Sequence, residues 1–262
     1  MIQDVKDFVS QYCAVDEPVP YNGLLIYPWI VKDFYRFGTS WDVLTIKKNE
    51  IPDVKIIQMS YLEFILSVMC NNYMEYENTG RTIGSIYLEK LENILCLSFH
   101  VNIDEISVKY DKNRYSLIIK GIEISSKQFD EIIKIILFQN IYDYFDDYID
   151  PEFKKAIDEY YAIKNKGIIV PDLEKKITVV TASTGIVKSE LLKMTYREFE
   201  NLFHTVLDMV DYKILKQAES SGMVKFDKPV EHWVYKQEKN RYEEAFTSYD
   251  GLKNKIEKSV GG

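Results

Sequence analysis

The residues best suited to metal chemistry form a short acidic run. Asp146, Asp147 and Asp150 make a DDxxD pattern, and Asp143 lies about one helical turn before them. Carboxylates three or four residues apart share one face of a helix, where their oxygens can bind Mg²⁺ and, through it, a diphosphate group. The run at 143–150 therefore allows one hypothesis, a magnesium-dependent enzyme that acts on phosphorylated substrates through Asp143, Asp146 and Asp147.

Three features of the sequence disfavour that enzyme. A diphosphate site of this kind pairs two acidic clusters on facing helices, and the sequence contains no second cluster. Pro151 begins a new segment at once, so Asp150 is better suited to cap the following helix. Carboxylates near the C-terminus of a helix also oppose the helix dipole. We therefore expect a solvated acidic face or a docking patch here, with no metal site and no cofactor.

Cysteine and histidine are too scarce for a metal site or a disulfide framework. The sequence has no CxxC, HxxxH or HExxH spacing. It also lacks the phosphate-binding motifs GxxxxGK[ST] and GxGxxG and the nucleophile motif GxSxG. Cys96 and His100 are four residues apart and could face the same way on a helix. Because Leu95 and Leu97 flank Cys96, we expect a buried thiol rather than a nucleophile. The remaining members of these two types are Cys13, Cys70, His204 and His232.

The clearest candidates for a binding function are aromatic residues near the C-terminus. They alternate with Lys and Glu, a composition in which aromatic side chains supply contact energy and charges keep the free segment in solution. Nucleic-acid stacking is the alternative, but the segment has nearly balanced charge rather than a basic excess. We predict a protein-binding arm whose contacts come from Trp233, Tyr235, Tyr242, Phe246 and Tyr249.

Composition agrees with a folded acidic protein. The 262 residues are 46% hydrophobic and 28% charged, the net charge is −8, and the pI is about 5.1. A duplex DNA-binding surface needs clustered Lys and Arg, so nucleic acid is not expected as a partner. No apolar run is long enough to cross a membrane, and the first residues lack a signal-peptide pattern, so a cytoplasmic protein is expected.

Hydrophobic periodicity predicts a mainly α (α+β) fold, a helical bundle with one small antiparallel β-hairpin element. In the hairpin, residues 105–124, apolar and polar residues alternate on both sides of the turn Asp111-Lys112-Asn113, and Ile122 and Ile124 can add a third strand. A strand-like run covers residues 24–27. The expected helices cover residues 1–13, 28–38, 52–77, 82–99, 125–148, 151–167, 171–185, 195–222 and about 237–247.

These elements suggest three regions. Residues 1–100 form an N-terminal helical region with a short strand, residues 101–222 a β-hairpin followed by a helical bundle, and residues 223–262 the polar aromatic arm. Residues 59–64 and 194–199 share a Met-Ser/Thr-Tyr-x-Glu-Phe pattern. It is explained either by a duplicated unit or, as we favour, by two helix starts that obey the same capping rule.

The first quarter of the chain resembles a known class of assembly proteins. In residues 19–34 a loop with Pro and Gly leads into an extended apolar strand and then a helix with an acidic residue near its start. This order resembles the opening of tail and baseplate assembly proteins of tailed bacteriophages, and residues 51–62 resemble structural proteins of phages of low-GC Gram-positive bacteria. The resemblance implies a non-enzymatic tail assembly chaperone or baseplate component. Its partner would be a phage structural protein, and it would act in the host cytoplasm or in the virion.

Overall fold

The computed structural model describes most of the chain in two compact units. The first unit contains Met1–Asp146 and Thr184–Leu202, and the second contains Asp147–Ser183 and Phe203–Gly262. No helix in the described part is both long and apolar enough to span a membrane. The described residues are 5–46, 48, 51–112, 114–141, 144, 157, 159–163, 166–167, 170–222, 224, 226 and 228–235.

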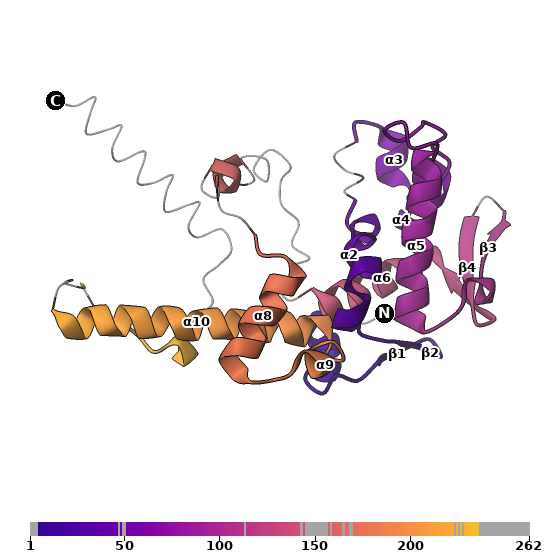
Figure 1. Cartoon of the computed structure of the whole chain (residues 1–262). Helices are drawn as coiled ribbons and strands as arrows, with labels where there is room; N and C mark the ends of the chain where they lie inside the picture. The colour runs from indigo at the N-terminus through magenta and orange to yellow at the C-terminus, as the bar shows by residue number, and fades with distance from the viewer. Residues whose placement is uncertain are drawn as a thin grey trace, which may run out of the picture. The chain divides into compact units, whose positions relative to one another are not determined.

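The fold is mainly helical with two small antiparallel sheets, as the sequence predicts except for the number of sheets (Figure 1). The helices of the first unit are α1 (Val5–Cys13), α2 (Phe34–Gly38), α3 (Val54–Gln58), α4 (Tyr61–Phe64), α5 (Ile83–Phe99), α6 (Ser126–Asn140) and α9 (Lys188–Leu191). Helix α10 (Tyr196–Ser221) begins in this unit. Short 3-10 turns cover Val31–Asp33, Trp41–Leu44 and Ile103–Glu105, and a π-helical turn covers Ile65–Met69.

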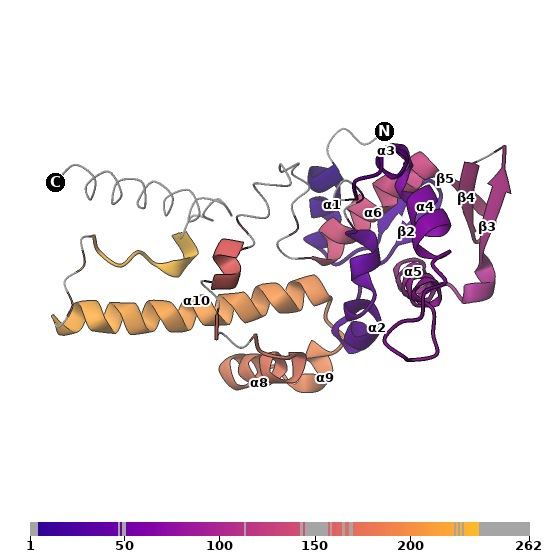
Figure 2. The same cartoon turned by 90° about the horizontal axis from the view of Figure 1, so that it is seen from above.

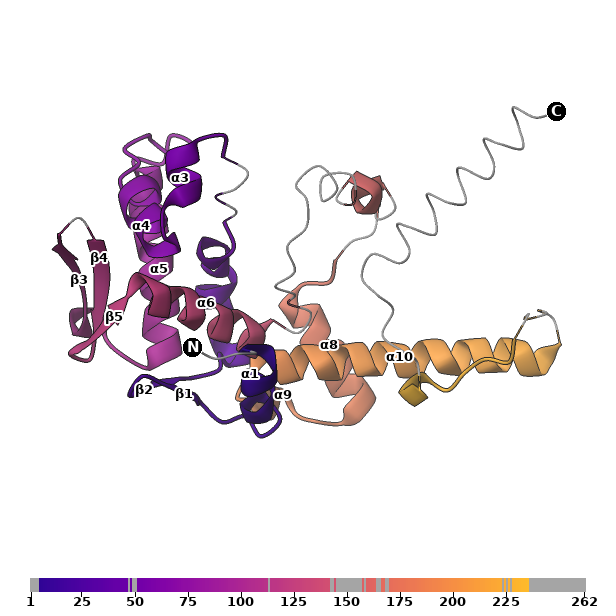
Figure 3. The ribbon, with the colours of Figure 1, turned by 180° about the vertical axis from the view of Figure 1, so that it is seen from behind.

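The predicted hairpin is confirmed and has its third strand. Strands β3 (Ile106–Asp111), β4 (Arg114–Ile119) and β5 (Ile122–Ser125) form one antiparallel sheet in that order. Leu117, Ile119 and Ile124 face the core and are buried, whereas the edge strand β3 is largely exposed. Strand β5 leads directly into α6 (Figure 3).

Helix α6 begins where the sequence predicts and ends earlier. Ser125 and Gln128 form both halves of a capping box at its N-terminus. The helix ends at Asn140 rather than near Tyr148, because the next residue, Ile141, is extended. Figure 2 shows α1 beside α6, and residues of the two helices are in contact.

The prediction of one long helix over residues 52–77 is wrong. Asp53 caps α3, but Met59 and Ser60 are extended. The Ser60 hydroxyl accepts a hydrogen bond from the Glu63 N–H to start α4. The capping signal therefore marks a break between two helices. Thr195 accepts the corresponding bond from the Glu198 N–H, so both copies of the shared pattern begin a helix.

Two further boundaries differ from the sequence-based expectations. Helix α2 begins at Phe34, so Pro28 does not open it, although Gly38 ends it as expected. Strands β1 (Val19–Tyr21) and β2 (Leu24–Ile26) form a second sheet that the sequence analysis did not predict as a hairpin. Its strands are only three residues long, and Pro20 in the first one weakens the strand signal.

The second unit contains helix α8 (Leu173–Thr184), the greater part of α10 and a 3-10 turn at Trp233–Tyr235. The predicted starts and ends of both helices are confirmed: Asp172 caps α8 by accepting from the Lys175 N–H, and Gly222 follows α10 with a positive φ of 70°. The Lys176 ammonium lies 5.3 Å from the centroid of the Phe203 ring, which joins α8 to α10. The helix predicted over 151–167 begins outside the described residues, and that predicted over 237–247 lies wholly outside them.

Candidate functional site

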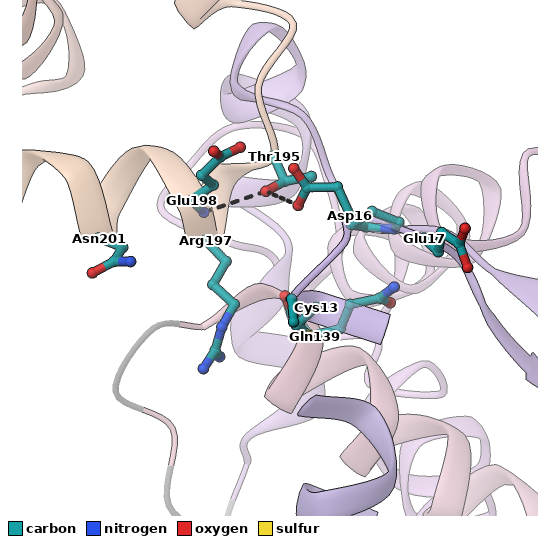
Figure 4. Close-up of a pocket in the computed structure, with 10 residues that line it drawn as sticks. Cys13, Asp16, Glu17, Gln139, Thr195, Arg197, Glu198 and Asn201 are labelled. Carbon is teal, nitrogen blue, oxygen red and sulfur yellow. Dashed lines mark hydrogen bonds between the residues drawn. The ribbon is translucent and has the colours of Figure 1, made fainter. Parts of the chain in front are cut away.

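A pocket of about 290 Å³ lies in the first unit (Figure 4). The turn after α1, the loop after β2, the end of α6 and the first turns of α10 contribute its walls. Most of its side chains are polar, and they include three carboxyl groups and one guanidinium. The lining residues are Cys13, Ala14, Asp16, Glu17, Pro28, Gln139, Thr195, Arg197, Glu198 and Asn201.

The turn after α1 places Asp16 at the pocket. Its backbone has a φ of 54°, in the left-handed region that Asp tolerates better than most residues. The Glu17 N–H donates to the carbonyl of Tyr12 and thereby closes the turn at the end of α1. The side chain of Asp16 points toward the first turn of α10 (Figure 4).

A short stretch of strand-like pairing places Thr195 opposite Asp16. The Val31 N–H donates to the Met194 carbonyl at 3.0 Å, and the Tyr196 N–H donates to the Trp29 carbonyl at 2.8 Å. Between these bonds, Ile30 and Thr195 form an antiparallel bridge. The start of α10 is therefore held to residues 29–31 by main-chain hydrogen bonds.

Trp29 anchors this arrangement in the core. Its N–H donates to Asn140 Oδ1 at 2.6 Å, and its indole Nε1 donates to the Ser98 hydroxyl at 2.9 Å. The Asn140 amide in turn donates to the Ile136 carbonyl. These polar groups are fully buried but hydrogen-bonded, which is the condition under which buried polar groups are tolerated.

The Thr195 hydroxyl links the two sides of the pocket. It donates to Asp16 Oδ1 at 2.9 Å and accepts from the Glu198 N–H at 3.3 Å (Figure 4). The Glu198 carboxyl lies near that of Asp16. Burial, a hydrogen bond with Asp16 and the negative charge of Asp16 all raise the pKa of Glu198. A raised pKa is expected where two carboxyl groups share a partly desolvated site.

Arg197 is held by main-chain carbonyls at the end of α6. Its Nη1 donates to the carbonyl of Phe138 at 2.6 Å and to that of Ile141 at 3.0 Å. Orphan carbonyls at a helix C-terminus are favourable partners for a cation. The guanidinium also lowers the pKa of Cys13, but burial outweighs it and raises that pKa. The thiol is therefore not primed as a nucleophile.

Gln139 supplies an acceptor that lacks a hydrogen-bond donor. The residue lines the pocket and is 2% exposed. Its Nε2 donates to the Ile26 carbonyl at 3.2 Å. Because a carbonyl can only accept, this bond sets the orientation of the amide and turns Oε1 to the other side. Gln139 Oε1 is buried and has no hydrogen-bond partner among the described residues.

The pocket is therefore an acceptor-rich site. The pocket is suited to bind a hydrogen-bond donor, because it offers carboxyl groups and an amide oxygen while Arg197 donates to main-chain carbonyls. No activated nucleophile lies among its lining residues. The described ranges contain no group of three or more His, Cys, Asp or Glu residues that could hold a metal ion.

No side-chain hydrogen bond joins Cys96 and His100 in the part of the chain that the structure describes. Cys96 lies on α5 beside Arg36 in a second pocket of about 320 Å³, and burial raises the pKa of its thiol. His100 leaves the helix with a φ of 48° and stacks on Tyr27, with 3.8 Å between ring centroids. Burial and the charge of Lys120 lower the pKa of His100.

Two of the five predicted partner-binding aromatics lie in the described part of the second unit. Trp233 and Tyr235 belong to one 3-10 turn, and Tyr235 is 71% exposed. The ring of the neighbouring His232 contacts the rings of Trp233 and Tyr212, at 5.7 and 4.7 Å between centroids. The Val230 N–H donates to Glu219 of α10, so this segment runs alongside that helix (Figure 3). Tyr242, Phe246 and Tyr249 lie outside the described residues.

Helix α10 presents a row of exposed aliphatic side chains in the second unit. Leu207, Val210 and Ile214 follow one another at three- and four-residue spacing and therefore share one face of the helix. Ile214 is 60% exposed. The neighbouring Leu215 is also exposed. We call Leu207, Val210 and Ile214 the α10 face.

Sequence reasoning missed the pocket. It identified Thr195 and Glu198 only as a helix cap, and it did not single out Asp16, Arg197 or Gln139. Asp16 and Thr195 are 179 residues apart, so no local spacing connects them. The acidic run with Asp143, Asp146, Asp147 and Asp150 lies outside the described residues.

Comparisons with known proteins give no indication of the function of this chain. No protein-family model, no curated protein and no solved structure matches the sequence or the fold.

Proposed function

We propose that this protein is a non-enzymatic bacteriophage tail or baseplate assembly protein, a chaperone or a structural component, that acts by binding another phage structural protein. The α10 face is the observation that carries the binding part of the proposal. Exposed aliphatic side chains in a row are unfavourable in water, and burial against a partner removes that cost. The phage assignment comes from the resemblance of residues 19–34 to tail and baseplate assembly proteins and of residues 51–62 to structural proteins of phages.

The aromatic segment supports the same function. Trp233 and Tyr235 follow α10 on a short turn, and both residue types are enriched at protein interfaces because they combine a large apolar surface with a polar group. We therefore assign partner-binding surfaces to the second unit, and the protein would act within the host cytoplasm or the assembled particle.

The test is affinity capture from a native phage-infected lysate with the tagged full-length chain. Mass spectrometry of the eluate should identify a tail or baseplate protein in a stoichiometric amount. An eluate without such a protein contradicts the proposal.

Two altered chains locate the binding surface. Changing Leu207, Val210 and Ile214 to Ser in one variant should lower capture at least about tenfold. Each change removes apolar surface whose burial against the partner contributes roughly 1 kcal/mol or more of binding free energy. The matched control replaces two exposed aliphatic residues of the first unit, Val54 and Ile57, with Ser.

A chain that ends at Gly222 should fold and lose capture. Equal capture by the Ser variant of α10 or by the shortened chain would remove the corresponding surface from the proposal.

A further inference from the structure

The pocket beside Asp16 and Glu198 brings several hydrogen-bond acceptors together. Among the described residues, no Lys or Arg forms an ion pair with Asp16, Glu17 or Glu198. Arg197 lines the pocket, but it donates to the carbonyls at the end of α6. Arg197 therefore offsets part of the negative charge of the pocket, but it donates from Nη1 to main-chain carbonyls and forms no ion pair with the three carboxyl groups.

The unpartnered amide oxygen of Gln139 is an independent sign of a missing donor. A buried acceptor without a hydrogen bond costs about 1–3 kcal/mol. This oxygen belongs to a side chain that is 98% buried and is fixed by its bond to Ile26. Gln139 lines the same pocket as the two carboxyl groups, so its oxygen adds an unsatisfied acceptor to this site.

We propose that this pocket binds an ammonium or guanidinium group, carried by a lysine or arginine side chain of the partner protein. A positive charge between Asp16 and Glu198 replaces their repulsion with two charge-assisted hydrogen bonds, which are among the strongest in proteins. A volume of about 290 Å³ suits a single side chain rather than a larger ligand. The source of the cation rests on the function proposed above, whereas the binding site rests on its own geometry.

The first experiment titrates the full-length chain with small probes in a calorimeter. The cationic probes are N-acetyl-lysinamide and N-acetyl-argininamide, and the neutral control is N-acetyl-norleucinamide, whose alkyl chain is similar. We expect both cations to bind and norleucinamide not to bind. Absence of binding by both cations, or equal binding of norleucinamide, overturns the proposal.

Substitutions assign the binding to this pocket. Glu198→Gln and Asp16→Asn keep the shape and an acceptor but remove a charge, so each should weaken cation binding at least about tenfold. The control is Glu92→Gln on α5, which removes a carboxylate whose pKa is also raised by burial but which lines the second pocket. Glu92→Gln should leave the affinity unchanged. Unchanged affinity in Glu198→Gln contradicts the site even if Asp16→Asn fails to fold.

Two further measurements separate the site from the source of its ligand. Spermidine represents a free polyamine, and tighter binding of spermidine than of either amide would overturn the assignment to a partner side chain. Capture of the phage partner should also be weaker with Glu198→Gln than with Glu92→Gln. Cation binding in the calorimeter without capture of a phage protein would leave this site standing and refute the proposed function.

Discussion

Thr195 uses one hydroxyl group both to cap α10 and to hold the turn after α1. Its oxygen accepts from the Glu198 N–H, and its proton goes to Asp16. The side chain is 7% exposed, so water does not replace these bonds easily when they are lost. A single side chain therefore couples two segments that are far apart in the sequence.

Thr195→Val should lower the free energy of unfolding by about 2 kcal/mol, roughly 1 for the cap and roughly 1 for the bond to Asp16. Urea denaturation followed by circular dichroism measures the change. Thr39→Val is the matched control, because the Thr39 hydroxyl bonds only to carbonyls of its own helical turn and is exposed. A similar effect of both substitutions would contradict the role of the Asp16 contact.

Glu198 makes stability depend on pH in a defined direction. Its pKa in the folded state is raised, so the folded chain binds its proton more tightly than the unfolded chain. The stabilising contribution is fully present below the unfolded pKa and is lost as pH rises through the folded pKa. Glu198→Gln should therefore raise the melting temperature at neutral pH and flatten its pH dependence across this interval. A variant with the wild-type pH profile would show that Glu198 does not carry this effect.

At the scale of elements, short signals predict the starts of helices better than their lengths. Three helices are capped by the hydroxyl residues Ser60, Ser125 and Thr195. These caps are predictable because each hydroxyl binds an N–H only three residues further along the chain. The predicted helix lengths are wrong where residues distant in the sequence bind the end of a helix. Helix α6 ends where Asn140 uses its side chain to bind Trp29 and where Arg197 binds the last carbonyls. Neither partner can be read from residues 125–148.

The pocket could not be predicted for the same reason. Its polar groups come from the end of α1, the end of α6 and the start of α10, and they meet only after the chain has folded. The three-stranded sheet, in contrast, was predictable, because alternation and a turn specify neighbouring strands locally.

Gly84 is required for the packing of α5. A Cβ at this position would lie 2.2 Å from the Cys70 carbonyl oxygen and 2.8 Å from that of Asn72. Gly84→Ala should therefore lower the free energy of unfolding by about 1–3 kcal/mol from overpacking, despite the better helix propensity of Ala. The control Gly38→Ala, at the end of α2, meets only Phe34 ring atoms at ordinary contact distance and should have little effect. Chemical denaturation of both variants checks this, and a neutral Gly84→Ala would contradict the close approach.

At the scale of the whole molecule, the first unit is assembled from two separate stretches of chain. Thr184–Leu202 returns to Met1–Asp146 after an excursion that belongs to the second unit. The returning stretch supplies the Met194 carbonyl for Val31, the Tyr196 N–H for Trp29 and the guanidinium for the end of α6.

A chain that ends at Asp146 should therefore be markedly less stable than one that ends at Gly222. Hydrogen exchange gives the local measure: the Val31 and Lys32 N–H groups, which donate to Met194 and Leu192, should be protected in the longer chain and exchange rapidly in the shorter one. Equal protection in both chains would show that the returning stretch is dispensable.

The returning stretch also determines when this protein can finish folding during translation. About 55 residues separate Asn140 from Thr195, and at roughly 5–20 residues per second the ribosome needs about 3 to 10 seconds to synthesise them. During that interval the Trp29 carbonyl and the Val31 N–H lack their partners Tyr196 and Met194, and the nascent chain exposes an unpaired edge beside an aromatic core. Synonymous codons that slow elongation between these two positions would lengthen this exposure without changing a single residue.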